Sequence, residues 1–288
     1  MTTPPPASPT AHWEPSKYLD DPDKYRHRLA SGNGHRFALI LLNQPIHIQR
    51  RLFDNLWENA TYRFCADGGA NRLYDFLKTD EERSRYLPDY VRGDLDSLHD
   101  HVKEYYQSKG VPCERVDDQE STDFMKCVEL ARSHDSKVPT TSNGFKSESN
   151  PADKASNMDD RVGIVALGGT GGRFDQVMSG VHHLFLLQSE RHAVILSEAS
   201  IITILGPGKH EIDCNLEIEG PTCGIIPVGS SECAITTSGL RWDIAFDEMA
   251  TSFGHRISSS NVLREPKVTV ETNVPVVWTT EIRDYESS

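Results

Sequence analysis

The chain lacks the segments that would carry a protein into or across a membrane. No apolar run among its 288 residues approaches the ~18 residues of a membrane-spanning helix. The first ten residues, MTTPPPASPT, contain neither the basic segment nor the apolar segment of a secretory signal. We therefore expect a cytoplasmic protein with no membrane partner.

Positive charge is also scarce. The sequence carries 43 acidic and 30 basic side chains, which gives a net charge of -13. A general nucleic-acid-binding protein needs a basic surface that displaces counterions, so this balance argues against nucleic acid as a partner. It is compatible with a local basic pocket that binds one small anion.

Cysteine pairs of the metal-binding or redox kind are missing too. No two of the six cysteines have the Cys-x-x-Cys spacing. They are scattered at Cys65, Cys113, Cys127, Cys214, Cys223 and Cys233. In a chain of this length the pattern is typical of free thiols in a reducing compartment, rather than of disulfides or a zinc site.

Residues 34–192 alternate apolar runs with segments of helical spacing. The run RFALILLN (36–43) is typical of a strand that is buried on both faces of a parallel sheet. Ile48, Leu52 and Leu56 follow it at roughly helical spacing, and the order of strand, turn and helix then recurs. This alternation predicts a three-layer α/β domain with a mostly parallel sheet.

The rest of the chain departs from that pattern. Residues 1–33 are rich in Pro, Ser, Asp and Gly and predict a flexible or loosely attached arm. Residues 134–160 are polar and predict a disordered surface insertion. From 193 to 288, short β-like runs are separated by Gly, Pro and Ser turns, which predicts an antiparallel β-sandwich as a second domain.

Two carboxylates, Asp94 and Asp96, stand two residues apart after a short apolar approach. Residues i and i+2 of an extended segment point to the same side, so both side chains could face one cavity. Magnesium prefers a few carboxylates together with phosphate oxygens and water. The alternative is that one Asp caps a helix and the other is solvated. Three further acidic or glycine-rich turns at the ends of predicted strands favour the metal, because ligands bind there in open α/β sheets.

The last of these turns is GGTGG (168–172), which Arg173 and Asp175 follow. It has no Walker lysine and is therefore not the common P-loop. Its glycines would let backbone N–H groups approach an anion, and Arg173 at the helix start could bind a phosphate with two hydrogen bonds. The alternative is a tight strand-to-helix turn with a surface Arg–Asp pair.

The segment STDFMKC reads as the start of a helix with Ser121 or Thr122 as the cap. Lys126 lies one turn after Thr122 and three residues after Asp123, so all three can share one side. This spacing is equally compatible with metal or phosphate contacts for Asp123 and Lys126 and with a simple helical ion pair.

In the predicted sandwich, Trp242 follows a glycine turn and could present its ring to a flat ligand. A single Trp in a β domain more often lies in the core. The segment SSSN (258–261) fits either a polar turn or a loop that binds a small ligand. The histidines, including His182 and His183, lack metal-binding spacing, and we expect packing or surface roles for them.

Taken in order, ADGGAN, GDLDS, DQESTD and GGTGGRFDQ resemble the motifs of the thiamine pyrophosphokinase family. The later TSGLRW, SSSN, VTVET and PVVWT are similar to the β domain of that family, so the resemblance covers roughly residues 36–282. Four motifs in order are far more specific than any one of them. The arm and the insertion look like additions of a fungal kind, and Glu120 stands where the family often has Asp.

The resemblance implies an ATP-dependent diphosphotransferase that makes thiamine diphosphate and AMP with Mg²⁺. It also implies a homodimer with active sites at the subunit interface. The implied catalytic residues are Asp67, Asp94, Asp96, Asp123 and Arg173, with Asp94, Asp96 and Asp123 as metal ligands. The implied ATP and phosphate contacts are Asn71, Gln119, Thr122, Lys126, Gly171, Gly172, Arg173 and Asp175. The implied thiamine contacts are Trp242, stacked on the pyrimidine ring, Ser260 and Asn261.

Three other functions stay open at this point. They are a phosphotransferase that acts on another small alcohol, a non-catalytic sensor of thiamine or nucleotide, and an acidic interaction protein. The intact Asp94, Asp96, Asp123 and Arg173 favour an enzyme, because a sensor could lose them. The acidic turns do not fix the acceptor, which depends on the region of Trp242 and Ser260.

Overall fold

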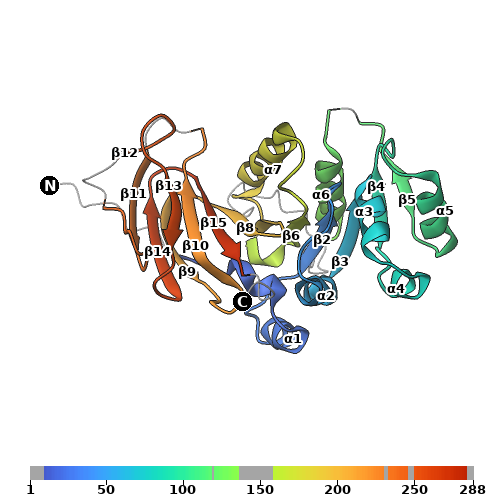
Figure 1. Cartoon of the computed structure of the whole chain (residues 1–288), viewed down its shortest axis with the longest axis horizontal. Helices are drawn as coiled ribbons and strands as arrows, with labels where there is room; N and C mark the ends of the chain where they lie inside the picture. The colour runs from blue at the N-terminus through green and yellow to red at the C-terminus, as the bar shows by residue number, and fades with distance from the viewer. Residues whose placement is uncertain (1–9, 119, 136–157, 230–232, 246–249, 284–288) are drawn as a thin grey trace, which may run out of the picture.

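The structure is a computed structural model that describes residues 10–118, 120–135, 158–229, 233–245 and 250–283 (Figure 1). Most of the segment 134–160, for which the sequence predicts a disordered insertion, lies outside these ranges, and so does Gln119. A large α/β part occupies one end of the molecule and a β-sandwich the other, as the sequence predicts. No helix among the described residues is long and apolar enough to cross a membrane.

One ten-stranded sheet runs through both parts. Its strands, in order across the sheet, are β13 (Ser258–Val262), β10 (Glu219–Ile226), β15 (Val276–Ile282), β8 (Ser200–Leu205), β7 (Ala193–Leu196), β6 (Gly163–Leu167), β2 (Phe37–Leu41), β3 (Tyr62–Ala66), β4 (Tyr90–Gly93) and β5 (Cys113–Arg115). The strands from β7 to β5 run parallel to one another, and every pairing from β13 to β7 is antiparallel. The run RFALILLN therefore forms a central strand, and all five residues of β2 are buried, as expected for a strand covered on both faces.

Helices cover both faces of the parallel strands (Figure 1). One face packs against α1 (Pro22–Ala30), α2 (Arg50–Asn59), α3 (Gly69–Phe76) and α5 (Asp100–Ser108). The other face packs against α6 (Asp123–Ser133) and α7 (Phe174–Leu187). Two short segments, α4 (Asp80–Arg85) and the 3-10 helix η3 (Met158–Asp160), complete the α/β part.

A second sheet of five strands closes the sandwich. Its strands, in order, are β1 (Ala11–Trp13), β9 (Gly208–Asp213), β14 (Lys267–Thr272), β11 (Cys233–Ser238) and β12 (Ala250–Thr251). Trp278, Ile225 and Val270 lie in the core between this sheet and the antiparallel strands of the large sheet. The predicted boundary at residue 193 is a few residues early, because β7 pairs in parallel with β6 and belongs to the α/β part.

The expectation of a loosely attached arm is wrong for residues 11–30. The strand β1 pairs with β9, and the 3-10 helix η1 (Pro15–Leu19) has all five residues buried. Tyr18 packs edge-on against Phe37 at 4.9 Å between ring centroids. The strand, the 3-10 turn and the helix α1 are each too short to produce a periodic pattern, which is why the sequence showed none.

The order of the parallel strands places the site. The chain moves outward from β2 through β3, β4 and β5, and then returns to form β6 on the other side of β2. The carboxyl ends of β2 and β6 therefore form a topological switch point, where open α/β sheets bind their ligands.

Candidate active site

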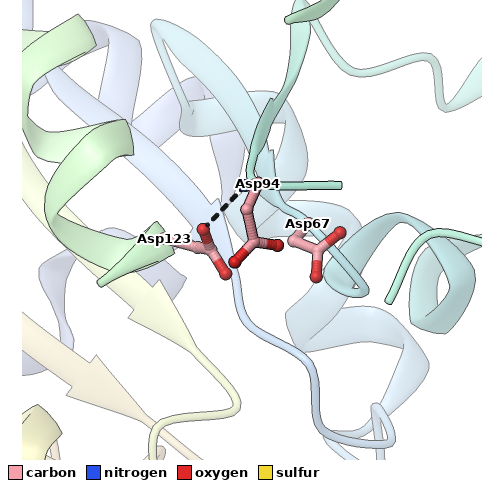
Figure 2. Close-up of side chains that lie close together, drawn as sticks. All are labelled: Asp67, Asp94 and Asp123. Atoms are coloured by element: carbon pink, nitrogen blue, oxygen red, sulfur yellow. Dashed lines mark hydrogen bonds between the residues drawn. The ribbon is translucent and has the colours of Figure 1, made fainter. Parts of the chain in front are cut away.

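Three aspartates meet at the carboxyl ends of the strands (Figure 2). Asp67 follows β3, Asp94 follows β4, and Asp123 is the first residue of α6. One carboxylate oxygen from each lies within 4.8 Å of the other two. We call Asp67, Asp94 and Asp123 the acidic triad. Its members come from three separate motifs in the sequence, and the parallel sheet brings them together.

The close approach of these side chains depends on Gly93. A Cβ atom at this position would lie 2.8 Å from Cβ of Asp67 and 2.9 Å from Oδ1 of Asp123. The end of β4 can therefore pass beside both carboxylates because it carries no side chain there. Asp67 itself has a φ of 46°, in the left-handed region that a non-glycine residue rarely adopts. Strain of this kind is concentrated at functional sites.

The triad carries more negative charge than its surroundings neutralise. Among the described residues, Oδ1 of Asp67 is buried without a hydrogen-bond partner, while Oδ2 accepts the backbone N–H of Ser97 at 3.1 Å. Burial raises the pKa of Asp67, hydrogen bonds from Ser97 oppose the rise, and the charges of Asp123 and Asp94 add to it. In the described part of the chain, Lys126 is the one side chain that forms an ion pair with the triad, at 3.0 Å from Oδ1 of Asp123. The triad therefore keeps a net negative charge that a further cation could neutralise.

Asp96 does not join the triad. Its neighbour Leu95 has a φ of 62°, so the segment is not extended and the i, i+2 rule that predicted a shared face does not apply. The side chain of Asp96 is 73% exposed, and its carboxylate lies 4.0 Å from Arg115. Its backbone N–H donates to Oδ1 of Asp94 at 3.1 Å. The structure therefore groups Asp67 with Asp94 and Asp123, and it leaves Asp96, which the resemblance implied as a metal ligand, outside the group.

A cavity of about 480 Å³ opens beside the triad at the switch point. Its walls come from the loops after β2 and β6, the start of α6 and the first turns of α7. Of the contacts that the sequence suggested, it is lined by Asp67, Asp94, Thr122, Asp123, Gly171 and Arg173. We call it the strand-end cavity.

The glycine loop forms one wall of this cavity. Gly171 and Gly172 have φ values of 94° and 65°, and a Cβ atom at Gly172 would lie 2.5 Å from Nε2 of Gln44. Arg173, at the N-cap position of α7, is 75% exposed and donates two hydrogen bonds to Asp175, at 3.1 and 2.5 Å. A helix N-terminus with an exposed guanidinium favours a phosphate, which could replace Asp175 as the partner of Arg173.

Two of the nucleotide contacts that the sequence suggested, Asn71 and Lys126, are buried and do not line the cavity. Asn71 donates to the carbonyl of Ser97 at 2.7 Å and accepts the N–H of His99 at 3.1 Å, so its amide fixes the loop after β4. Lys126 is 3% exposed and acts on the cavity through Asp123. The predicted cap of α6 is confirmed, because Thr122 accepts the N–H of Met125 at 3.3 Å.

A second cavity, of about 320 Å³, lies in the sandwich. It is lined by Trp242, Asp243, Ile244, Arg256, Ile257, Ser258, Ser259, Ser260 and Asn261. Trp242 is 52% exposed and is therefore not a core residue. The side-chain amide of Asn261 holds the backbone of Trp242. It accepts the N–H of Trp242 at 3.2 Å and donates to the carbonyl of Trp242 at 2.8 Å. Ser260 has a φ of 56° within β13, where the pairing with β10 shifts register, so the predicted turn or loop at 258–261 is an irregular strand.

Sequence reasoning missed several residues of the strand-end cavity, among them Gln44 and His183. Gln44 follows the first predicted strand, and the rule that ligands bind at strand ends, if applied to that strand as well, would have found it. His183 also lines the cavity but carried no signal. Two adjacent helical residues face different directions, so the pair His182 and His183 could not show which ring is buried.

Comparisons with known proteins agree with this architecture. The family model "Thiamin pyrophosphokinase, catalytic domain" matches residues 53–196, and "Thiamin pyrophosphokinase, vitamin B1 binding domain" matches residues 209–277. The chain is 36% identical over 262 residues to a thiamine pyrophosphokinase 3 of Oryza sativa subsp. japonica, covering 88% of this chain and 89% of the relative. It is 33% identical over 250 residues to the thiamine pyrophosphokinase of Saccharomyces cerevisiae, covering 78% of each.

Solved structures give the same result. The thiamin pyrophosphokinase of Candida albicans superposes with a TM-score of 0.76 at 28% identity, over 96% of this chain and 95% of that chain. The yeast thiamin pyrophosphokinase superposes with a TM-score of 0.76 at 29% identity, over 97% and 93%. Both parts of the fold are therefore shared with these proteins.

Proposed function

This chain belongs to the thiamin pyrophosphokinase family, and we propose that it transfers the pyrophosphoryl group of ATP to the hydroxyl oxygen of thiamine. The products are thiamine diphosphate and AMP. The observation that carries the proposal is the acidic triad beside the glycine loop and Arg173, in one cavity at the switch point of the sheet. Carboxylates alone would repel the phosphates of a nucleotide, so this combination requires a cation between them.

Magnesium fits the residues that are present. The triad offers hard oxygen ligands that lie within 4.8 Å of one another, and Oδ1 of Asp67 is buried without a partner among the described residues. Asp67, Asp94 and Asp123 would hold the ion, and Asp96 lies outside this set. Bound there, Mg²⁺ would neutralise phosphate charge and stabilise the charge that develops during transfer.

The other residues of the cavity would bind and orient the nucleotide. The backbone of the glycine loop, the N-terminus of α7 and Arg173 would bind phosphate oxygens. The hydroxyl oxygen of thiamine attacks the β-phosphorus, the bond from that phosphorus to the α-phosphate oxygen breaks, and AMP leaves with the electron pair. The hydroxyl proton passes to solvent or to a carboxylate. Most of the rate enhancement then comes from positioning and from electrostatic stabilisation.

We further propose that thiamine binds at Trp242 and that the active enzyme is a cytoplasmic homodimer. None of the described residues lines both cavities, so acceptor and donor would meet when a second copy adds its sandwich to the strand-end cavity. The helix α7 beside that cavity exposes Phe174 (76%), Met178 (38%) and Leu186 (53%), which are spaced along one helical stripe. A second chain would cover this apolar stripe and bring Trp242 to the thiamine ring.

Product analysis tests the proposal. The purified protein is incubated with thiamine, ATP and Mg²⁺, and the products are separated by chromatography. We expect thiamine diphosphate and AMP in equal amounts. ADP with thiamine monophosphate would contradict pyrophosphoryl transfer, and the absence of product from folded protein would favour a sensor or another acceptor.

A further inference from the structure

One titratable side chain of the strand-end cavity has no role in the function proposed above. His183, in the middle of α7, is 6% exposed and lines the cavity. Its ring packs edge-on against Phe124 of α6, with 5.3 Å between the centroids. Burial, with a smaller contribution from His182, lowers the pKa of His183 to about 4, so the imidazole is neutral at physiological pH.

The neighbours of His183 define which ring nitrogen is engaged. Nε2 lies 3.4 Å from Oγ1 of Thr122. That oxygen already accepts the N–H of Met125, and its own proton has no other acceptor among the described residues. We take the Thr122 hydroxyl as the donor to Nε2, an assignment that places the proton of the neutral ring on Nδ1. Within the described part of the chain, Nδ1 has no hydrogen-bond partner, so this tautomer leaves a donor for a ligand.

The walls around His183 differ from the rest of the cavity. Phe124 packs against His183, and Val177 and Gly180 of α7 also line the cavity, whereas the charged lining residues are the triad, which would hold the cation, and Arg173. A nucleotide has the same division between an uncharged nucleoside and a charged phosphate chain. The chemistry of the two regions thus matches the two halves of the ligand.

We propose that His183 is a specificity residue for the nucleotide, whose Nδ1–H donates a hydrogen bond to an acceptor atom of the nucleoside. This inference rests on the proposed use of ATP, and it adds a residue that recognises the nucleoside of ATP. Thr122 would then have a double role, because the hydroxyl that caps α6 would also fix the tautomer of His183.

The test compares three substitutions of His183 by calorimetric titration with AMP and with inorganic pyrophosphate. Asparagine keeps an N–H donor near the position of Nδ1, glutamine places its amide toward Thr122, and phenylalanine keeps the ring without a donor. His101→Gln, at an exposed position of α5 away from the cavity, is the matched control. Thermal midpoints establish that all the variants are folded.

We expect His183→Phe and His183→Gln to raise the dissociation constant for AMP about tenfold, the size of one lost hydrogen bond. His183→Asn and His101→Gln should stay within about threefold of the wild type. Pyrophosphate affinity should not change in any variant. A changed ratio of AMP to GMP affinity would assign the contact to the base, and an unchanged ratio to the ribose.

The inference is overturned if His183→Phe binds AMP as tightly as the wild type, or if the asparagine variant fails like the other two. A parallel loss of pyrophosphate affinity would also overturn it, since it would mean that His183 supports the whole site. The binding assay needs no turnover. A wild type that binds AMP with this pattern but makes no thiamine diphosphate would therefore refute the proposed function alone.

Discussion

Two groups of carboxylates lie at opposite ends of the parallel strands, and they have different partners. At the carboxyl ends, the acidic triad has one basic partner, Lys126, among the described residues. At the amino ends of β6 and β7, Asp135 and Glu190 are held by arginines. Arg191 reaches Asp135 at 3.0 Å, and Arg132 reaches Glu190 at 2.9 Å. We call Asp135, Glu190, Arg132 and Arg191 the paired cluster.

The two groups of carboxylates also differ in their pKa values. Burial alone would raise the pKa of Glu190, but hydrogen bonds from Arg132 and Arg191 lower it to about 2. Burial and like charges raise the pKa of Asp67. Acids that the fold neutralises contribute to its stability, whereas acids that it leaves without a counter-charge weaken the free protein and are available to a ligand.

The largest predicted effect separates the two groups by activity. Asp94→Asn should lower kcat/KM at least about 10³-fold, equivalent to about 4 kcal/mol, because a ligand of the charged centre is lost. Without Mg²⁺, the same change should leave the thermal midpoint unchanged or higher, since it removes repulsion within the triad. Steady-state kinetics and calorimetry measure both quantities.

Asp96→Asn is the matched control for that variant. It makes the same chemical change two residues away, on a side chain that is 73% exposed. We expect its loss of kcat/KM to be smaller than that of Asp94→Asn by at least about tenfold. Equal losses would restore the pairing of Asp94 and Asp96 that the sequence suggested.

The second prediction concerns the paired cluster. Arg191 is 1% exposed, and its removal would leave Asp135 and Glu190 without their buried partner. Arg191→Met should lower the free energy of unfolding by about 3–4 kcal/mol. At temperatures where the variant is folded, the KM values for both substrates should stay at the wild-type level. Urea denaturation and steady-state kinetics measure these quantities. A variant that is as stable as the wild type but inactive would contradict the assignment of the paired cluster to stability.

The third prediction is a pH dependence. The pKa of Glu190 is about 2 in the folded state, below its ordinary value of 4.5. Its contribution to stability is therefore complete above pH 4.5 and is lost as the pH falls toward 2. We expect Glu190→Gln to flatten the acid limb of the stability curve by about 2 kcal/mol over this window. An unchanged acid limb would show that the ion pairs of Glu190 contribute nothing to the free energy of unfolding.

The fourth and smallest effect lies outside both groups. Trp242→Ala should raise the KM for thiamine about tenfold through lost ring stacking, and Trp242→Phe should keep most of the affinity. The KM for ATP should not change, because Trp242 does not line the strand-end cavity. A rise in the KM for ATP instead would place the nucleotide, not thiamine, at Trp242.

The sequence predicted the architecture well because its signals are local. Apolar runs marked the buried strands, and the cap and ion pair of Thr122, Asp123 and Lys126 followed from helical spacing. The turns that carry Asp67, Asp94 and the glycine loop were found for the same reason, since each follows a recognisable strand.

What the sequence could not give depends on backbone conformation and on distant contacts. The exclusion of Asp96 from the triad follows from the left-handed φ of Leu95, which no spacing rule reports. The pairing of Arg191 with Asp135 joins residues 56 positions apart. The packing of residues 11–30 likewise depends on Trp13 and Tyr18 finding distant partners, His210 and Phe37.

Binding of Mn²⁺, a paramagnetic substitute for Mg²⁺, tests most directly that the triad is the cation site. Electron paramagnetic resonance counts the free ion during a titration in the presence of pyrophosphate. We expect one bound ion per chain in the wild type and in Arg191→Met, and at least about tenfold weaker binding in Asp94→Asn. Wild-type affinity for Mn²⁺ in folded Asp94→Asn would contradict the account, because it would show that the acidic triad does not hold the metal.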